Sequence, residues 1–428
     1  MGKIFPVKTI TFFVYVLLFG IVGTPLAAED SPTVRRLQET RECPNCNLKG
    51  ANLQNTYLIN ANLNGANLNR ANLRGANLSG AYLRSAKLRG AILREANLNG
   101  ADLLSADLGG SDLRNSQING ETVLDKKWRL VWEIANKPDP SLDLQGADLE
   151  DANLSHANLS NLNLEGANLK NANLKATNMR SANLSHVNLR GADLFIADLR
   201  NAKLTQADLI EANLNSADLR DADLSGADLR KSNLNLTNLR NSNLSGSKLV
   251  AANLKDADLT GINLSNANLQ RANLLNTSLS HTNLTGANLS GSNLTGVNLK
   301  NTNLTNANLQ GINLNGSSLS GAIVSGANLR GSLLRDVNLS GANLKGADLS
   351  GINLTGANLS GSDLTGVNLS GANLSRADLS QANLSDANLT RANLSEANLK
   401  GATLIGVKFN RTNLCKTILP EGKQHNCR

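Results

Sequence analysis

The sequence predicts an all-β solenoid, in which short extended segments form coils that stack on one another, and three observations predict it. From Leu144 to Leu419 a Leu returns at every fifth residue, and only Met179, Val324 and Phe409 take its place. The residue two positions before each Leu is mostly Ala, and the residue between them is mostly Asn or Asp. The two residues after each Leu are mostly polar or Gly. A repeat this regular decides the fold class before any single motif is considered.

The five-residue period fits neither an α-helix, which repeats about every 3.6 positions, nor a simple strand, which alternates. Ala-Asn-Leu fits a short extended segment with Ala and Leu inside and Asn outside. The remaining two residues must turn the chain, and Gly, Asn, Ser and Asp suit the backbone dihedrals that such a turn requires. Each segment then pairs with the coils above and below at about 4.8 Å. Because one coil cannot bury its own Leu residues, stability has to come from stacked neighbours.

The repeated unit A(N/D)LxG, which occupies most of the chain, resembles the pentapeptide repeat family. The resemblance implies a right-handed quadrilateral β-helix with four units in each coil. This coil agrees with arginines that recur at a spacing of four units in two series, Arg74, Arg94 and Arg114, and Arg180, Arg200, Arg220 and Arg240.

Residues 1–28 have the features of a signal peptide. Lys3 and Lys8 precede an apolar run over residues 9–23, and small residues at 25–28 favour cleavage near Ala27 or Ala28. The run is shorter than the roughly 20 residues that a membrane span requires, although an uncleaved anchor is the alternative. The sequence therefore predicts an exported protein of a periplasm, thylakoid lumen or extracellular space.

The mature chain divides into blocks. Residues 29–45 form an N-terminal lead-in or cap, 46–118 a first repeat block, 119–143 an insert, 144–419 a second repeat block and 420–428 a C-terminal cap or tail. The insert is real because Leu113 and Leu144 lie one residue more than six units apart, so the frame slips between the blocks.

The insert contains the only helix that the mature sequence predicts, with Thr122 as its N-cap and Pro138 and Pro140 beyond its end. Trp128 and Trp132, one turn apart beside Arg129, are candidates for docking a partner. The alternative is that the apolar stripe packs on the flank or end of the first repeat block, as such stripes usually do. The stripe comprises Leu124, Trp128, Val131, Trp132 and Ala135.

Four cysteines in an exported chain favour two disulfides. Their spacing supports pairing Cys43 with Cys46 and Cys415 with Cys427. A redox pair or a zinc site is the alternative. A site shared by all four is disfavoured, because the two pairs lie at opposite ends of the predicted stack.

The sequence predicts no catalytic, metal or cofactor site. Leu side chains fill the middle of so narrow a coil, which leaves no room for a substrate inside. The chain contains neither a phosphate-binding glycine loop nor a Ser, His and Asp set in a known motif. The four-sided model separates the histidines, which are His156, His186, His281 and His425. An enzyme is therefore not expected, and function belongs to a face, an end or the insert.

Charge limits the partners. The chain has 42 Lys and Arg against 34 Asp and Glu, so an acidic mimic of DNA, as the resemblance would allow, is disfavoured. Nucleic acid binding is also disfavoured, because aromatic residues do not alternate with the basic ones. The second Arg series, Arg180 to Arg240, is a candidate ladder for an anionic ligand. The alternative is that Asp198, Asp218 and Asp221 neutralise it.

Two functional hypotheses follow. The first is a structural or interaction protein that presents flat faces to a protein or envelope partner, with end-to-end homodimers as one arrangement that the resemblance allows. The second is a module whose basic or hydroxyl-lined face recognises an anionic polymer, a membrane surface or ice. Lys300 interrupts the row of hydroxyls that the ice hypothesis would use, which comprises Ser280, Ser320, Ser340, Ser360 and Ser380.

Overall fold

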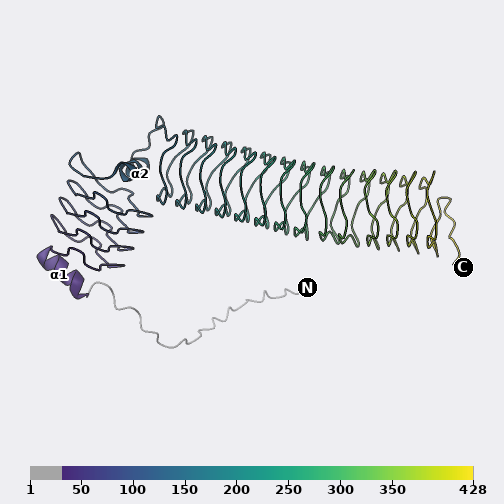
Figure 1. Ribbon diagram of the computed structural model, residues 1–428, viewed down its shortest axis with the longest axis horizontal. Helices are drawn as coiled ribbons and strands as arrows, with labels where there is room; N and C mark the ends of the chain where they lie inside the picture. The colour runs from purple at the N-terminus through teal and green to yellow at the C-terminus, as the bar shows by residue number, and fades with distance from the viewer. Residues whose placement is uncertain (1–30, 428) are drawn as a thin grey trace, which may run out of the picture.

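The computed structural model describes residues 31–427, which form two stacks of coils and two helices. The short first stack follows helix α1 (Pro32–Thr40), and the long second stack follows helix α2 (Lys126–Asn136). In Figure 1 the two stacks run in different directions, so that the rod bends at α2. The predicted signal peptide lies outside the described residues.

The coils have a uniform register. Parallel bridges join residues that are 20 apart, such as Asn163 with Asn183, so each coil contains four five-residue units. In the described residues these bridges are isolated rather than part of longer strands, because only the middle residue of each unit pairs before the chain turns again. The predicted all-β solenoid is thus a stack of single-residue bridges at a four-unit period.

Backbone hydrogen bonds explain why the unit has five residues. The N–H of Leu184 donates to the carbonyl of Lys203 in the next coil at 2.7 Å, and the N–H of Lys203 donates back to Ala182 at 3.0 Å. The last residue of each unit takes a left-handed conformation, with φ of 68° at Gly226 and 59° at Asn241. This is the region that Gly and Asn tolerate best, which confirms the turn expected from the sequence.

The interior is a single apolar core that runs through both stacks. Leu residues such as Leu184, Leu224 and Leu289 have exposed fractions of 0%, and the Ala two positions before each Leu is buried as well. The predicted inward orientation of Leu and Ala is therefore confirmed.

Helix α1 was not expected, and the prediction that the insert contains the only helix is wrong. Ser31 caps α1 by accepting a hydrogen bond from Thr33 N–H, and Pro32 occupies its first turn, where proline fits. Val34 and Leu37 are buried against the first coil, whose Leu48 is 2% exposed. Two apolar residues three positions apart in a polar segment are too weak a pattern to predict a helix.

Helix α2 lies within the predicted insert, but it begins at Lys126, after Asp125 in the N-cap position. Thr122 is therefore not the N-cap. Its hydroxyl donates instead to the carbonyl of Leu98 at 3.0 Å, because the first stack continues to a bridge between Asp102 and Val123. The two partners of that bridge are one position further apart in the chain than the partners of the other parallel bridges.

Contacts of α2 with both stacks explain the bend. Asn136 donates to the carbonyl of Leu113 in the first stack, and Lys127 pairs with Asp148 of the second stack at 3.1 Å. A helix is about 10 Å wide, roughly twice the spacing of stacked coils. At another corner, however, Gly110 N–H donates directly to the carbonyl of Asp151 at 2.6 Å. The two stacks therefore touch at one corner and are held apart by the helix elsewhere. This wedge tilts the axis of the second stack away from that of the first.

Candidate functional site

The outer sides carry columns of Asn that bond mainly to one another. The side-chain amide of Asn253 donates to Asn233 Oδ1 at 3.2 Å, and that of Asn233 donates to Asn213 Oδ1 at 3.0 Å. The same Asn233 oxygen accepts from the backbone N–H of Asn235 at 3.3 Å. These hydrogen bonds use much of the hydrogen-bonding capacity of each amide, so the main role of the Asn columns is to stabilise the stack.

An Asp in such a column has no side-chain N–H to donate to the residue below. At some of these positions a nearby Arg donates hydrogen bonds to the Asp instead. Asp198 and Asp218 stack directly, and Arg200 and Arg220 each form an ion pair with the Asp two residues before, at 2.5 and 2.6 Å. The hydrogen bond from Arg200 holds the pKa of Asp198 below its ordinary value. Burial alone would raise the pKa of Asp218, but its hydrogen bonds with Arg220 bring it below the ordinary value.

The candidate ladder Arg180, Arg200, Arg220 and Arg240 is accordingly surrounded by acid. Arg200 also lies 3.7 Å from Asp218, and Arg240 lies 3.7 Å from Asp258. The charge of Arg180 contributes to the lowered pKa of Asp198. The arrangement agrees with the neutralised alternative and leaves little uncompensated charge for an anionic ligand.

Replacing Arg220 by Ala is expected to cause a small loss of stability at pH 7, because two stacked carboxylates lose a counterion. The lowered pKa of Asp218 contributes stability that is present above its unfolded-state pKa of about 3.9 and is lost as the pH falls through the folded value. The difference between wild type and Arg220→Ala should therefore shrink in acid. Thermal unfolding at several pH values measures it. Adding Asp218→Asn to Arg220→Ala should restore stability, since the new amide can donate to Asp198, and failure of this rescue would contradict the account.

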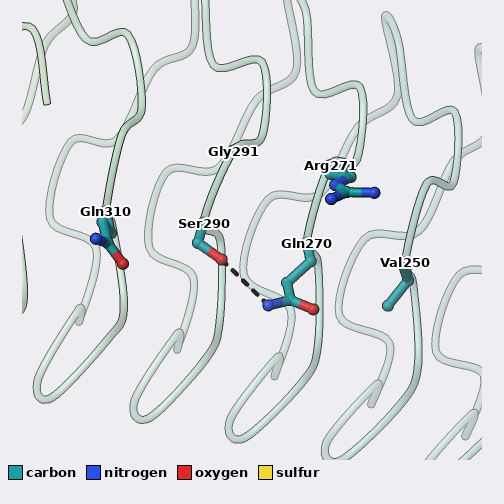
Figure 2. Close-up of a pocket in the computed structure, with 6 residues that line it drawn as sticks. All are labelled: Val250, Gln270, Arg271, Ser290, Gly291 and Gln310. Carbon is teal, nitrogen blue, oxygen red and sulfur yellow. Dashed lines mark hydrogen bonds between the residues drawn. The ribbon is translucent and has the colours of Figure 1, made fainter. Parts of the chain in front are cut away.

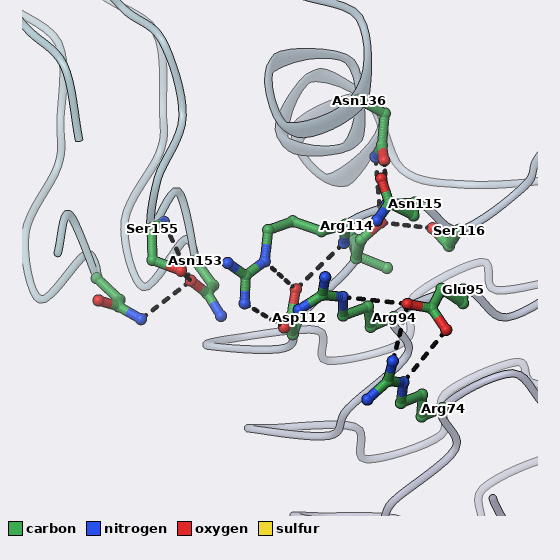
Figure 3. A network of polar contacts seen from close by, with 12 residues as sticks. Arg74, Arg94, Glu95, Asp112, Arg114, Asn115, Ser116, Asn136, Asn153 and Ser155 are labelled. Atoms are coloured by element: carbon green, nitrogen blue, oxygen red, sulfur yellow. Dashed lines mark hydrogen bonds and ion pairs between the residues drawn. The ribbon is translucent and has the colours of Figure 1, made fainter. Parts of the chain in front are cut away.

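The Arg series of the first stack is also paired, as Figure 3 shows. Arg74 donates to Glu95 at 3.2 and 3.1 Å, and Arg94 lies 3.4 Å from the same carboxylate. Arg114 forms an ion pair with Asp112 at 2.6 Å. Burial alone would raise the pKa of Asp112, but the hydrogen bonds from Arg114 keep it below the ordinary value.

The candidate docking residues of the insert face the protein. Trp128 and Trp132 are only 8% and 7% exposed, and Trp132 Nε1–H donates to the carbonyl of Ser116 at 3.0 Å. Arg129 donates to the carbonyl of Thr122 at 2.8 Å. Little of either ring is left for a partner, and the arrangement agrees with the alternative that the stripe packs on the end of the first block.

Basic side chains gather on one part of the first stack. No Asp or Glu occurs between residues 43 and 94, and Arg84 and Arg89 reach to Asp102 and Asp107 in the coil above for their ion pairs. Three further basic residues are exposed and form no ion pair with the described residues, and we call them the basic surface: Lys49, Arg70 and Lys87. They were not predicted, because they occupy a side and its adjacent corner rather than a single row at coil spacing.

The two cysteine pairs lie at disulfide distance at opposite ends of the protein. The Cα atoms of Cys43 and Cys46 are 5.3 Å apart, and those of Cys415 and Cys427 are 4.4 Å apart. Within residues 31–427 no cysteine is free, and no group of His, Cys, Asp and Glu could hold a metal ion. Neither helix of this part of the chain is long and apolar enough to cross a membrane.

A shallow hollow of about 470 Å³ lies on one corner of the second stack, where Gln270, Ser290 and Gln310 follow one another in successive coils (Figure 2). Gln270 Nε2 donates to Ser290 Oγ at 3.3 Å, and Arg271 and Gly291 complete the rim. The lining offers no nucleophile activated by a base and no pair of carboxylates.

The predicted hydroxyl row Ser280 to Ser380 lies on another corner, where part of its capacity is used internally. Ser320 and Ser340 are bonded to each other at 3.1 Å, and Ser360 donates to Asn358 Oδ1 at 2.7 Å. Neither the hollow nor this row presents a set of free donors at regular spacing.

A family model described as pentapeptide repeats matches residues 46–115, 142–194 and 197–419 in overlapping segments. No curated protein matches the chain. Several solved structures are similar to parts of the chain, with TM-scores of 0.42 or lower.

The similar structures include a pentapeptide repeat protein involved in the regulation of heterocyst differentiation in the cyanobacterium Nostoc, HetL. It is 37% identical over 53% of this chain and 92% of its own, with a TM-score of 0.42. A pentapeptide repeat protein of the Arabidopsis thaliana thylakoid lumen is 30% identical over 26% of this chain and 69% of its own, with a TM-score of 0.15. A third, Rfr23 of the cyanobacterium Cyanothece, is 33% identical over 26% and 60%, with a TM-score of 0.09.

The family model covers well over half of the chain, and its segments coincide with the two stacks of four-unit coils. The chain belongs to the pentapeptide repeat family.

Proposed function

We propose that this protein is a non-enzymatic, exported scaffold that binds a protein or envelope partner through its flat outer faces. The observation that carries the proposal is the filled core, in which residues such as Leu184 and Leu224 are 0% exposed. A solid interior leaves the surface as the place of function. The repeated backbone ladder holds that surface rigid, which reduces the entropy that binding would cost.

Export is part of this proposal. The two cysteine pairs at disulfide distance suit an oxidising compartment, where such bonds persist. We expect the mature protein to begin just after Ala27 or Ala28 and its four cysteines to resist alkylation until a reductant is added. N-terminal sequencing and mass spectrometry after thiol labelling measure both. An intact Met1 with four reactive thiols in the native protein would contradict export.

Partner binding is tested by capture from the exported fraction with the purified mature protein as bait. A partner that binds the outer faces should remain bound when the residues of α2 that face the core are kept and only an exposed residue of the helix is changed, as in Lys126→Ala. Substitutions on an exposed side of the second stack, such as Lys175→Glu and Lys255→Glu, should reduce capture if the partner binds that side. Failure to retain any protein with the wild-type bait would contradict the scaffold.

The basic surface favours a second function, recognition of an anionic polymer or membrane surface. Lys49, Arg70 and Lys87 lie on adjoining positions of successive coils and form no ion pair with the described residues; Asp107, the vertical neighbour of Lys87, pairs with Arg89 instead. Retention of the purified protein on an anionic polymer at low salt, and its loss when all three residues are replaced by Ser, would favour this function over protein binding.

A further inference from the structure

The two ends of the protein differ in how completely they are covered. At the N-terminal end α1 lies over the first coil, and Cys43, Leu48 and Leu53 beneath it are at most 2% exposed. At the C-terminal end the apolar residues of the last coil are only partly buried, whereas Leu399 in the coil before is 0% exposed. The partly covered residues are Leu404, Val407, Phe409 and Leu414.

The last coil also leaves its backbone unpaired on three of its four sides. In the preceding coil the N–H groups of Leu384, Leu389 and Leu394 donate to the carbonyls of Thr403, Lys408 and Asn413 at 2.8 to 2.9 Å. The equivalent N–H groups of the last coil belong to Leu404, Phe409 and Leu414. Among residues 31–427 nothing accepts a hydrogen bond from these three. Open donors on three successive sides, beside apolar side chains, are a template for a further segment of chain that pairs side by side with the last coil.

The fourth side shows how such a segment binds. The chain turns back after Leu419, and Gln424 forms an antiparallel bridge with Ile418. Lys416 N–H donates to the carbonyl of His425 at 2.9 Å, and His425 N–H donates to Thr417 at 2.8 Å. The Cys415–Cys427 pair holds this tail in place. The protein's own tail therefore occupies one side of the end as an added strand and leaves the other three.

The charge around the open end decides which partner fits. Glu421 is the single acid between residues 400 and 427, and the exposed basic residues of this rim are Lys400, Lys408, Arg411, Lys416 and Lys423. Two copies that met through this end would place two basic rims together. Stacking onto the N-terminal end of another copy is blocked by α1, which itself exposes Arg35 and Arg36. Like charges therefore disfavour association of two C-terminal ends, whereas the head-to-tail arrangement is disfavoured because α1, which also exposes Glu39, covers the N-terminal end.

We propose that the C-terminal end of the second stack binds an acidic segment of a partner protein, which turns at the corners as the coils do and pairs with Leu404, Phe409 and Leu414 on three successive sides. Apolar residues of the segment cover the exposed core, and its carboxylates face the basic rim. The proposal specifies the kind of partner that the scaffold binds, and it rests on the proposed scaffold function. Binding of a synthetic peptide to the purified protein tests this proposal alone. A negative result would not contradict the capture of a partner by the outer faces.

The probe is a synthetic peptide with the sequence of residues 142–156, which alternates Leu and Ala with the acids Asp143, Asp148, Glu150 and Asp151. We expect it to bind the full-length mature protein and to slow amide hydrogen exchange at Leu404, Phe409 and Leu414. Binding should weaken about tenfold when the four acids are replaced by Asn and Gln, and by a similar factor with Lys408→Glu, Arg411→Glu and Lys416→Glu together. The matched control changes Arg190, Lys300 and Lys345 to Glu, which alters the net charge equally at exposed positions away from this end, and should bind the peptide as wild type does.

Three results would overturn the proposal. The first is no binding of the acidic peptide, and the second is binding that protects amides elsewhere or responds equally to both sets of charge changes. The third is a stable dimer in analytical ultracentrifugation with the three amides already protected, which would assign the open end to a second copy of the chain.

Discussion

Replacing Leu224 by Ala is expected to lower the free energy of unfolding by about 2–5 kcal/mol. Leu224 is 0% exposed and lies inside the second stack, where coils above and below prevent the cavity from collapsing. In a repeat stack each coil contacts only its neighbours, so a weakened coil uncouples the parts on either side. Denaturant unfolding followed by circular dichroism should show an earlier and broader transition than in wild type.

The control for this variant is Ser225→Ala, one position further along the chain. Ser225 lies at the polar corner, where a substitution should change stability by no more than about 0.5 kcal/mol. If Leu224→Ala unfolds at the same midpoint as Ser225→Ala, the packed core does not carry the stability of the stack.

Replacing Trp132 by Ala is expected to lower the free energy of unfolding of the first stack by about 3–5 kcal/mol. The indole is 7% exposed, and its Nε1–H donates to both the carbonyl and the hydroxyl of Ser116 at 3.0 and 3.1 Å. Loss of the ring opens a cavity between α2 and the last coil of the first stack. Small-angle X-ray scattering should also show a wider range of shapes, because α2 holds the bend between the stacks.

Trp132→Phe separates packing from hydrogen bonding. It keeps most of the apolar contact and removes only the donor, so its loss should be about 1–3 kcal/mol. An Ala variant that keeps wild-type stability and scattering would show that α2 is a surface appendage, and would favour the docking alternative for Trp128 and Trp132.

The repeat made much of the fold predictable, because position in the unit determines environment. Leu and Ala point inward, Asn forms the outer columns, and residues such as Gly226 and Asn241 turn the chain with positive φ. The neutralisation of Arg200 and Arg220 was one of the two alternatives drawn from the sequence, since Asp198 and Asp218 occupy equivalent positions four units apart, each two positions before an Arg.

Features outside the repeat could not be predicted in the same way. Helix α1 has only Val34 and Leu37 as buried residues, and the bend arises from the width of α2 between two coils rather than from any pattern in the sequence. The uncovered C-terminal end had one signal, the replacement of Leu by Phe409, but its exposure depends on the path of the tail after Leu419.

The four-unit register has a consequence for how the length of such a protein can change. Deleting one whole coil from the second stack, such as residues 282–301, brings each later residue down one level under the same vertical neighbour. Deleting a single unit keeps every Leu inside but rotates the remainder by a quarter turn, so that Asp and Arg columns meet new neighbours. Duplications and deletions of whole coils should therefore be tolerated. A change of a single unit would leave the interior intact but bring different outer columns into line on either side of the change.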